Sequence, residues 1–201
     1  MSDVKELKYG NTRCYLINST LLIDTDMAGT LQSFFSCIKK SEAAFDKIQC
    51  LICTHYHPDH MGIAQDLVEL GIKLVVFEEQ KRFIHFSDAV FARDRHIQFK
   101  PIKDQDTICI SCADSRNFLK KLGIDGEVIH TPGHSDDSVS IIIDGRCAIV
   151  GDLPPLHLIP AYNDQVLEKS WNKILSKNVS EIFYAHPNSE KTAGIHSISD
   201  L

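Results

Sequence analysis

Four side chains able to bind metal ions lie within six residues of one another, so the fold must bring them to a single point. They are His55, His57, Asp59 and His60, and they follow directly on an apolar run at residues 48–53. Successive side chains of an extended segment point to opposite faces, so His55 and His57 lie on one side and can share a cation. Asp59 and His60 come after a proline and can turn toward a second cation. The spacing predicts a site for two metal ions at the end of a strand.

An accidental cluster of surface histidines is the alternative. A lone His-x-His pair occurs by chance, but four ligand types packed at a junction between strand and helix favour a metal site.

The string His-x-His-x-Asp-His resembles the signature of the metallo-β-lactamase superfamily, whose later ligands lie on separate loops in the order His, Asp, His. Three motifs match that order, and each follows an apolar, strand-like run. They are His134 in Thr131-Pro132-Gly133-His134-Ser135, Asp152 in Gly151-Asp152, and His186 in Tyr184-Ala185-His186-Pro187. The resemblance extends from about residue 10 to about residue 190 and implies a four-layer αββα sandwich.

The resemblance also implies a role for each matching residue. His55, His57 and His134 would hold one metal; Asp59, His60 and His186 would hold the second; Asp152 would bridge the two. Asp59 would in addition be catalytic, accepting or relaying a proton from the attacking water. Asp24 ends an early strand-like run, and we expect it to orient the ligand loop, because ligating histidines usually donate their other N–H to such a partner.

The chain departs from common family patterns in two places. Many members carry Gly-His-Gly at the final histidine, where this chain has Ala185-His186-Pro187, and His196 is the substitute candidate if His186 is not the ligand. The loop after Asp152 contains two prolines and an extra histidine, His157, which is close enough in sequence to reach the site.

Divalent ions held by imidazoles lower the pKa of bound water to about 7, so we expect hydrolysis of an ester, thioester, lactone, amide or phosphodiester bond. Zinc is the expected metal, with iron or manganese as alternatives. A persulfide dioxygenase-like oxidoreductase with one iron and a non-catalytic metal-binding protein stay open. The diiron flavoprotein branch is disfavoured because it typically has Glu where His57 stands. No nucleophile elbow, phosphate loop or dinucleotide fingerprint competes with this interpretation.

Composition sets the remaining bounds. A chain of 201 residues with 43% hydrophobic content can bury one sizeable core, and we expect one domain over residues 1–201. No apolar run approaches about 18 residues, and the first six residues lack the profile of a signal peptide. The seven cysteines are an odd number, which suits a reducing compartment. We therefore expect a cytoplasmic protein with no membrane partner.

Two Cys-x-x-Cys spacings, at residues 50–53 and 109–112, resemble zinc or redox motifs. Both lie in strand-like runs, where residues three apart face opposite sides. We expect these cysteines to be small core residues.

The periodicity alternates between strands and helices, which predicts an α+β protein with two mixed sheets and helices outside. The expected strands are near residues 4–8, 13–18, 20–24, 48–53, 72–77, 107–112, 126–131, 138–143 and 147–151. The expected helices are at residues 29–41, after the metal motif up to Gly71, and at residues 163–177. The last begins with an Asn/Asp cap and places Val166 and Trp171 on an apolar stripe.

The expectation about the substrate depends on residues 80–103. This segment contains six basic residues and only two acidic ones, in a chain whose net charge is −6. The basic residues are Lys81, Arg82, Arg93, Arg95, Lys100 and Lys103, and the acidic ones are Asp88 and Asp94. This segment can overhang the site and attract an anionic small molecule, or it can be an ordinary solvated surface. We expect a small-molecule substrate; a nucleic acid is disfavoured but stays open, and the sequence leaves the oligomeric state undetermined.

Overall fold

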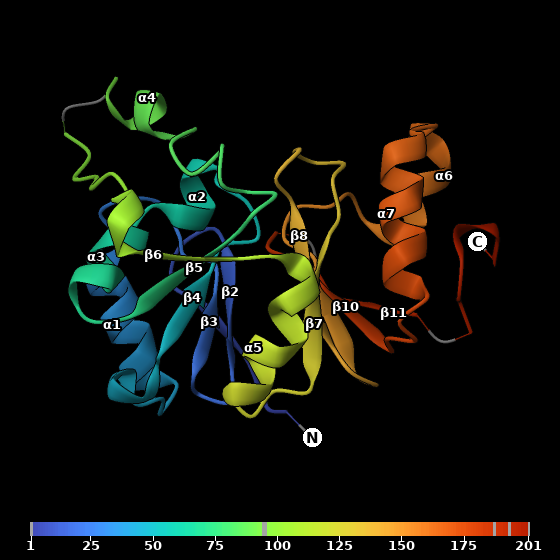
Figure 1. Ribbon diagram of the computed structural model, residues 1–201, viewed down its shortest axis with the longest axis horizontal. Coiled ribbons are helices and arrows are strands. Elements are labelled where there is room, and N and C mark those ends of the chain that lie inside the picture. The colour runs from blue at the N-terminus through green and yellow to red at the C-terminus, as the bar shows by residue number, and fades with distance from the viewer. Residues whose placement is uncertain (1, 94–95, 187, 193, 201) are drawn as a thin grey trace. The chain divides into compact units, whose positions relative to one another are not determined.

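The computed structural model describes residues 2–93, 96–186, 188–192 and 194–200 and divides the chain into two compact units, Met1–Ser111 and Cys112–Leu201 (Figure 1). Each unit contains one mixed β-sheet with helices packed on it. The predicted α+β class with two mixed sheets is therefore confirmed, and the single domain over residues 1–201 stays a prediction. Within the described ranges, no helix is long and apolar enough to cross a membrane.

The first unit holds a sheet of six strands in the order of the sequence. The strands are β1 Val4–Lys8, β2 Arg13–Ile17, β3 Leu21–Ile23, β4 Cys50–Ile52, β5 Lys73–Phe77 and β6 Thr107–Ile110. The first three are antiparallel, and β3 to β6 are parallel. Asn18 and Ser19 turn β2 into β3 with φ values of 49° and 59°, the left-handed conformation that a tight hairpin requires.

The α-helices that the structure describes in the first unit are α1 Leu31–Lys40, α2 Pro58–Met61, α3 Ala64–Glu69 and α4 Asp88–Phe91. Apolar side chains of α1 and α3, such as Phe34 and Leu67, share one core with Leu51 and Leu74 of the sheet. Because parallel strands end at one edge of a sheet, this arrangement brings the loops after β3, β4 and β5 together.

The second unit holds a sheet of five strands in the order β11-β10-β9-β8-β7. The strands are β7 Gly126–His130, β8 Val139–Ile143, β9 Cys147–Ile149, β10 Glu181–Phe183 and β11 Glu190–Lys191. Only β9 and β10 run parallel; the other pairs are antiparallel. The helices are α5 Ser115–Lys121, α6 Ile159–Tyr162 and α7 Gln165–Leu175, and Trp171 of α7 lies in one core with Ile142 and Ile182.

The predicted elements are confirmed with small shifts of their ends, and Asp164 caps α7 by accepting the amides of Val166 and Leu167. Two expectations are wrong. Val166 is half exposed, because α7 buries the neighbouring Leu167 and leaves Val166 at the side of the buried stripe. Cys109 is exposed on β6, the edge strand of its sheet. Cys50 and Cys53 are buried as expected.

Candidate metal centre

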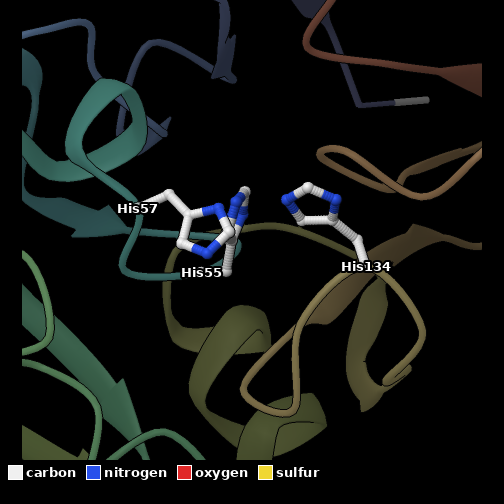
Figure 2. Close-up of side chains that lie close together, drawn as sticks. All are labelled: His55, His57 and His134. Atoms are coloured by element: carbon white, nitrogen blue, oxygen red, sulfur yellow. The ribbon is translucent and has the colours of Figure 1, made fainter.

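The loop after β4 carries the four clustered side chains of the first unit. His55 and His60 are almost completely buried, whereas His57 and Asp59 are half-buried. The His55 ring centroid lies 4.5 Å from that of His57 and 4.0 Å from that of His60. Figure 2 shows the rings of His55 and His57 side by side at the start of α2. The predicted convergence of these side chains is therefore present in the first unit.

Asp24, at the end of β3, organises this loop through Thr54. Its Oδ1 accepts the Thr54 amide at 2.6 Å, and its Oδ2 accepts the Thr54 hydroxyl at 2.8 Å. The backbone of Asp24 has φ of 59°, a left-handed conformation that aspartate tolerates better than most residues. The conformation turns the carboxylate toward the next strand, β4, whose Ile52 carbonyl accepts the Asp24 amide.

The same network fixes which imidazole nitrogens can bind a metal. The His60 Nδ1 lies 3.0 Å from Asp24 Oδ2, and a carboxylate can only accept, so Nδ1 carries the proton. The Thr54 hydroxyl donates its one hydrogen to Asp24, so toward His55 it acts as an acceptor, and His55 Nδ1 donates to it at 3.2 Å. Both rings therefore carry their lone pair on Nε2, the arrangement in which histidine ligands are held by a carboxylate partner.

Asp59 has a contact of its own at the β1–β2 turn. Its Oδ2 accepts the Thr12 hydroxyl at 3.3 Å and lies 3.8 Å from His60 Nε2. Thr12 is itself buried and fixed by a hydrogen bond from its amide to Asp26. The carboxylate of Asp59 is thereby held beside the Nε2 of a predicted ligand.

The second unit brings its three predicted ligands together independently. His134 lies on the loop after β7 (Figure 2), Asp152 follows β9, and His186 follows β10. Asp152 Oδ2 is 3.6 Å from His134 Nε2, and Asp152 Oδ1 is 3.3 Å from His186 Nε2. A single carboxylate thus faces two imidazoles with its two different oxygens, as a bridging ligand would.

The loops of Asp152 and His186 are joined by backbone hydrogen bonds that extend the β9–β10 pairing. The Val150 amide donates to Phe183, and the Ala185 amide donates to Gly151 at 2.9 Å. This pairing fixes His186 relative to Asp152, although Pro187, the last residue of the predicted motif, lies outside the described residues.

His157 belongs to a cluster of hydrogen bonds around Glu190, and the groups of possible metal ligands found among the described residues do not include it. Its Nδ1 contacts Glu190, which also accepts the Tyr184 hydroxyl and, at 2.9 Å, the Leu156 amide. Burial and next the hydrogen bond to Glu190 raise the pKa of Tyr184 well above its ordinary value, so the phenol stays a donor. Burial alone would raise the pKa of Glu190, but the hydrogen bonds from Tyr184 and His157 outweigh it, so the pKa of Glu190 is lowered. These hydrogen bonds to Glu190 hold the loop after β9 against β11.

Two histidines outside the proposed ligand set also have structural partners. His85 bridges Asp88 and Asp104, and His130 Nε2 contacts the Asp136 carbonyl at 2.7 Å.

Sequence reasoning missed three polar residues that hold the ligand loop. Thr54 orients two imidazoles, as described above. Gln80 is fully buried and donates to the Cys53 and Thr54 carbonyls, and Ser87 donates to the Tyr56 carbonyl at 2.6 Å. Thr54 could have been suspected as the neighbour of His55, but nothing in the spacing of Gln80 or Ser87 indicates contact with a loop more than 25 residues earlier.

The donor atoms fit a divalent metal ion. Imidazole nitrogens and carboxylate oxygens are ligands that zinc, iron and manganese share, and each unit presents both types within a few ångströms. The histidine and aspartate residues gathered here could hold a metal.

Comparison with known proteins gives concordant matches. The chain is 28% identical over 184 residues to a beta-lactamase-like protein 2 homolog of Drosophila melanogaster, covering 88% of this chain and 59% of that protein. A lactamase-like protein of Pestalotiopsis microspora is 24% identical over 90% of this chain and 51% of its own length. The chain therefore spans between half and three fifths of the length of these relatives.

Solved structures show the same fold. A metallo-beta-lactamase from Cronobacter sakazakii, mutated in its HARLDQ motif, aligns with a TM-score of 0.64 and 18% identity over 91% of this chain and 77% of that one. A chemotaxis sensor in a peroxy diiron state aligns with a TM-score of 0.64 and 18% identity over 97% of this chain and 87% of that one. The family profile of the metallo-beta-lactamase superfamily matches residues 7–186, and the chain belongs to that superfamily.

Proposed function

We propose that this protein is a metal-dependent hydrolase with a dinuclear centre that cleaves an ester, thioester, lactone, amide or phosphodiester bond. The proposed ligands are His55, His57 and His134 for one ion, Asp59, His60 and His186 for the other, and Asp152 for both. The observation that carries the proposal is Asp152, whose two oxygens face the Nε2 atoms of His134 and His186 at 3.6 and 3.3 Å.

Two divalent ions in such a site activate water for attack near neutral pH and polarise the oxygen of the scissile bond. The residues of the chain supply position and proton transfer. Asp59 is the proposed acceptor of the proton of the attacking water; its contact with the Thr12 hydroxyl and its position 3.8 Å from His60 Nε2 support this role. Asp24 keeps His60, and through Thr54 also His55, in the tautomer that offers Nε2.

Zinc is the proposed metal. His57 stands where diiron flavoproteins of the superfamily typically carry glutamate, which favours zinc over a diiron centre. The structural likeness to a diiron sensor shows the fold alone, so iron is an outcome that metal analysis must decide.

The proposed substrate is a small molecule, and the basic residues after β5 favour one with negative charge. Lys100 is paired with Asp66 and Glu69, and Lys103 with Glu69, so these two lysines are largely neutralised. Lys81, Arg82 and Arg93 form no ion pair among the described residues, whereas Asp94 and Arg95 lie outside them. Those three cations are what supports attraction of an anion.

The proposal is tested by metal analysis together with turnover. Protein purified without added metal should contain zinc and hydrolyse a reporter ester or phosphodiester, and Asp152→Asn should lose metal and activity together. Asp136→Asn is a matched control, because Asp136 lies exposed near His134 and is not a proposed ligand. One iron per chain with oxidation of a persulfide would favour an oxygenase, and substoichiometric metal without turnover would leave a binding protein.

A further inference from the structure

The segment between β5 and α4 is fastened to the loop that carries the histidines. Gln80 is fully buried, and its side-chain Nε2 donates to the backbone carbonyls of Cys53 at 2.9 Å and Thr54 at 3.2 Å. Its side-chain oxygen accepts the backbone amide of Phe77. Ser87, also fully buried, donates to the Tyr56 carbonyl at 2.6 Å. Because both anchors bind the backbone around His55, the chain from Gln80 to Ser87 has a fixed position beside that loop.

Between the two anchors, consecutive turns fix the backbone. The Phe83 amide donates to the Gln80 carbonyl, and the Phe86 amide donates to the Phe83 carbonyl, each at 2.8 Å. Ile84 points into the core and is only 3% exposed. Phe86 is 58% exposed, the largest value among the exposed apolar side chains of the described residues.

The exposed ring of Phe86 lies against a proposed metal ligand. Its centroid is 5.7 Å from that of the His57 ring, with 35° between the ring planes. One side of Phe86 therefore covers His57, and the rest of the ring faces outward. An exposed aromatic ring that is held by buried polar anchors next to a reacting centre has the features of a specificity wall, which gains contact area when a ligand covers it.

We propose that Phe86 forms an apolar wall of the substrate site and selects substrates with an aryl or branched apolar group next to the scissile bond. The inference rests on the proposed hydrolase function, because it takes His57 as a ligand at the reacting centre. An apolar group seated on Phe86 would remove water from both surfaces, and an aromatic one would also gain from ring contact. Phe86 thus determines specificity, and it is not a catalytic residue.

The test compares two esters with the same leaving group, p-nitrophenyl acetate and p-nitrophenyl phenylacetate, on zinc-loaded wild type and Phe86→Ala. KM for the phenylacetate ester should rise about tenfold in the variant, the ratio expected for an aromatic contact that is lost, while the acetate ester changes little. Phe86→Leu should keep part of the preference. Leu70→Ala is the control, because Leu70 is another exposed apolar residue of the same unit, at the end of α3.

Two further measurements separate the possible causes. Zinc content should be the same in wild type and Phe86→Ala; loss of zinc, or equal effects on both esters, would mean that Phe86 only supports His57 and would overturn the proposal. Binding of phenylacetate and acetate is also measured by calorimetry. If neither ester is hydrolysed, ester hydrolysis fails as the activity, but phenylacetate binding that depends on Phe86 would still support the wall, and binding that does not would overturn it.

Discussion

Asp24 acts on the proposed metal site through the residues that it holds. Its Oδ2 receives both the Thr54 hydroxyl and His60 Nδ1. Asn can adopt the left-handed backbone of this position, but its NH2 group is a donor. It would therefore face the groups of Thr54 and His60 that donate to Asp24. We expect Asp24→Asn to weaken zinc binding about 10- to 100-fold, the usual effect of losing a partner of this kind.

Competition with a zinc-chelating dye measures that affinity. The matched control is Asp66→Asn, which alters a mostly buried carboxylate of α3 in the same unit; this carboxylate pairs with Lys100. Zinc affinity equal to that of wild type in Asp24→Asn would contradict the orienting role.

Asp59 combines two proposed roles, ligand and proton acceptor. Replacing it with Ala removes both, and the fold should persist because the residue is only half-buried and lies on a loop, where the Thr12 hydroxyl donates to it. Hydrolysis of a reporter ester should fall by about 100-fold or more. Circular dichroism checks the fold, and turnover that persists in a folded variant would defeat the mechanism.

Among single residues, the sequence predicted those candidate site residues that are neighbours in the chain or that directly follow a strand. The ligand string could be found because four of its members are neighbours, and Asp152 and His186 because each directly follows an apolar run. Gln80, Ser87 and Phe86 could not, because their roles arise from tertiary contacts with a segment about 30 residues away in sequence.

Among the elements, the segment from Gln80 to α4 is joined to the turn before β6 by one histidine. His85 Nε2 contacts Asp104 at 2.7 Å, and Nδ1 contacts Asp88 at 3.0 Å. The hydrogen bond to Asp104 raises the pKa of His85 most; burial opposes it, and Asp88 adds to the rise. The imidazolium form is therefore the one that joins these elements.

A pKa raised in the folded state stabilises the protein below the unfolded value, about 6.5, and that stabilisation is lost as pH rises through the folded pKa. We expect His85→Gln to lower the melting temperature at pH 6 more than at pH 8. The gain is small, since His85 is about half exposed. His196→Gln is the control for loss of an exposed histidine. The same shift at both pH values would mean that the two carboxylates do not act through the charge of His85.

The elements that the sequence predicted are those with a clear period and end signals. The helix α7 was found from its stripe and its Asp164 cap, and the parallel strands from their continuous apolar runs. The short α6 and the two-residue β11 have no period to detect, since each spans only about one repeat of its pattern. Val166 was misplaced because the buried face of α7, which includes Leu167 and Trp171, is narrower than the apolar stripe of the sequence.

For the whole molecule, membership of the superfamily rests on motifs spread from residue 7 to residue 186, across both compact units. For this reason the resemblance to the superfamily predicted more about the fold and the candidate site than the periodicity of the sequence did. Alternation of strands and helices predicts only a mixed class, whereas the order of ligands along the chain predicts which strand ends carry function.

The proposed ligand set draws on both units, so metal binding should be linked to the stability of the whole chain. A metal ion that binds only the folded state stabilises that state by about 2.7 kcal/mol when the free ion concentration is 100 times the dissociation constant. We expect two zinc ions per chain, and a melting temperature that falls on chelation and recovers with zinc. His57→Ala and His186→Ala should each retain one ion, because the proposal assigns these residues to different ions, and His196→Ala should retain two. Mass spectrometry under native conditions counts the ions directly; a single ion in fully loaded wild type, or loss of both ions in each ligand variant, would refute the assignment of two separate ligand sets.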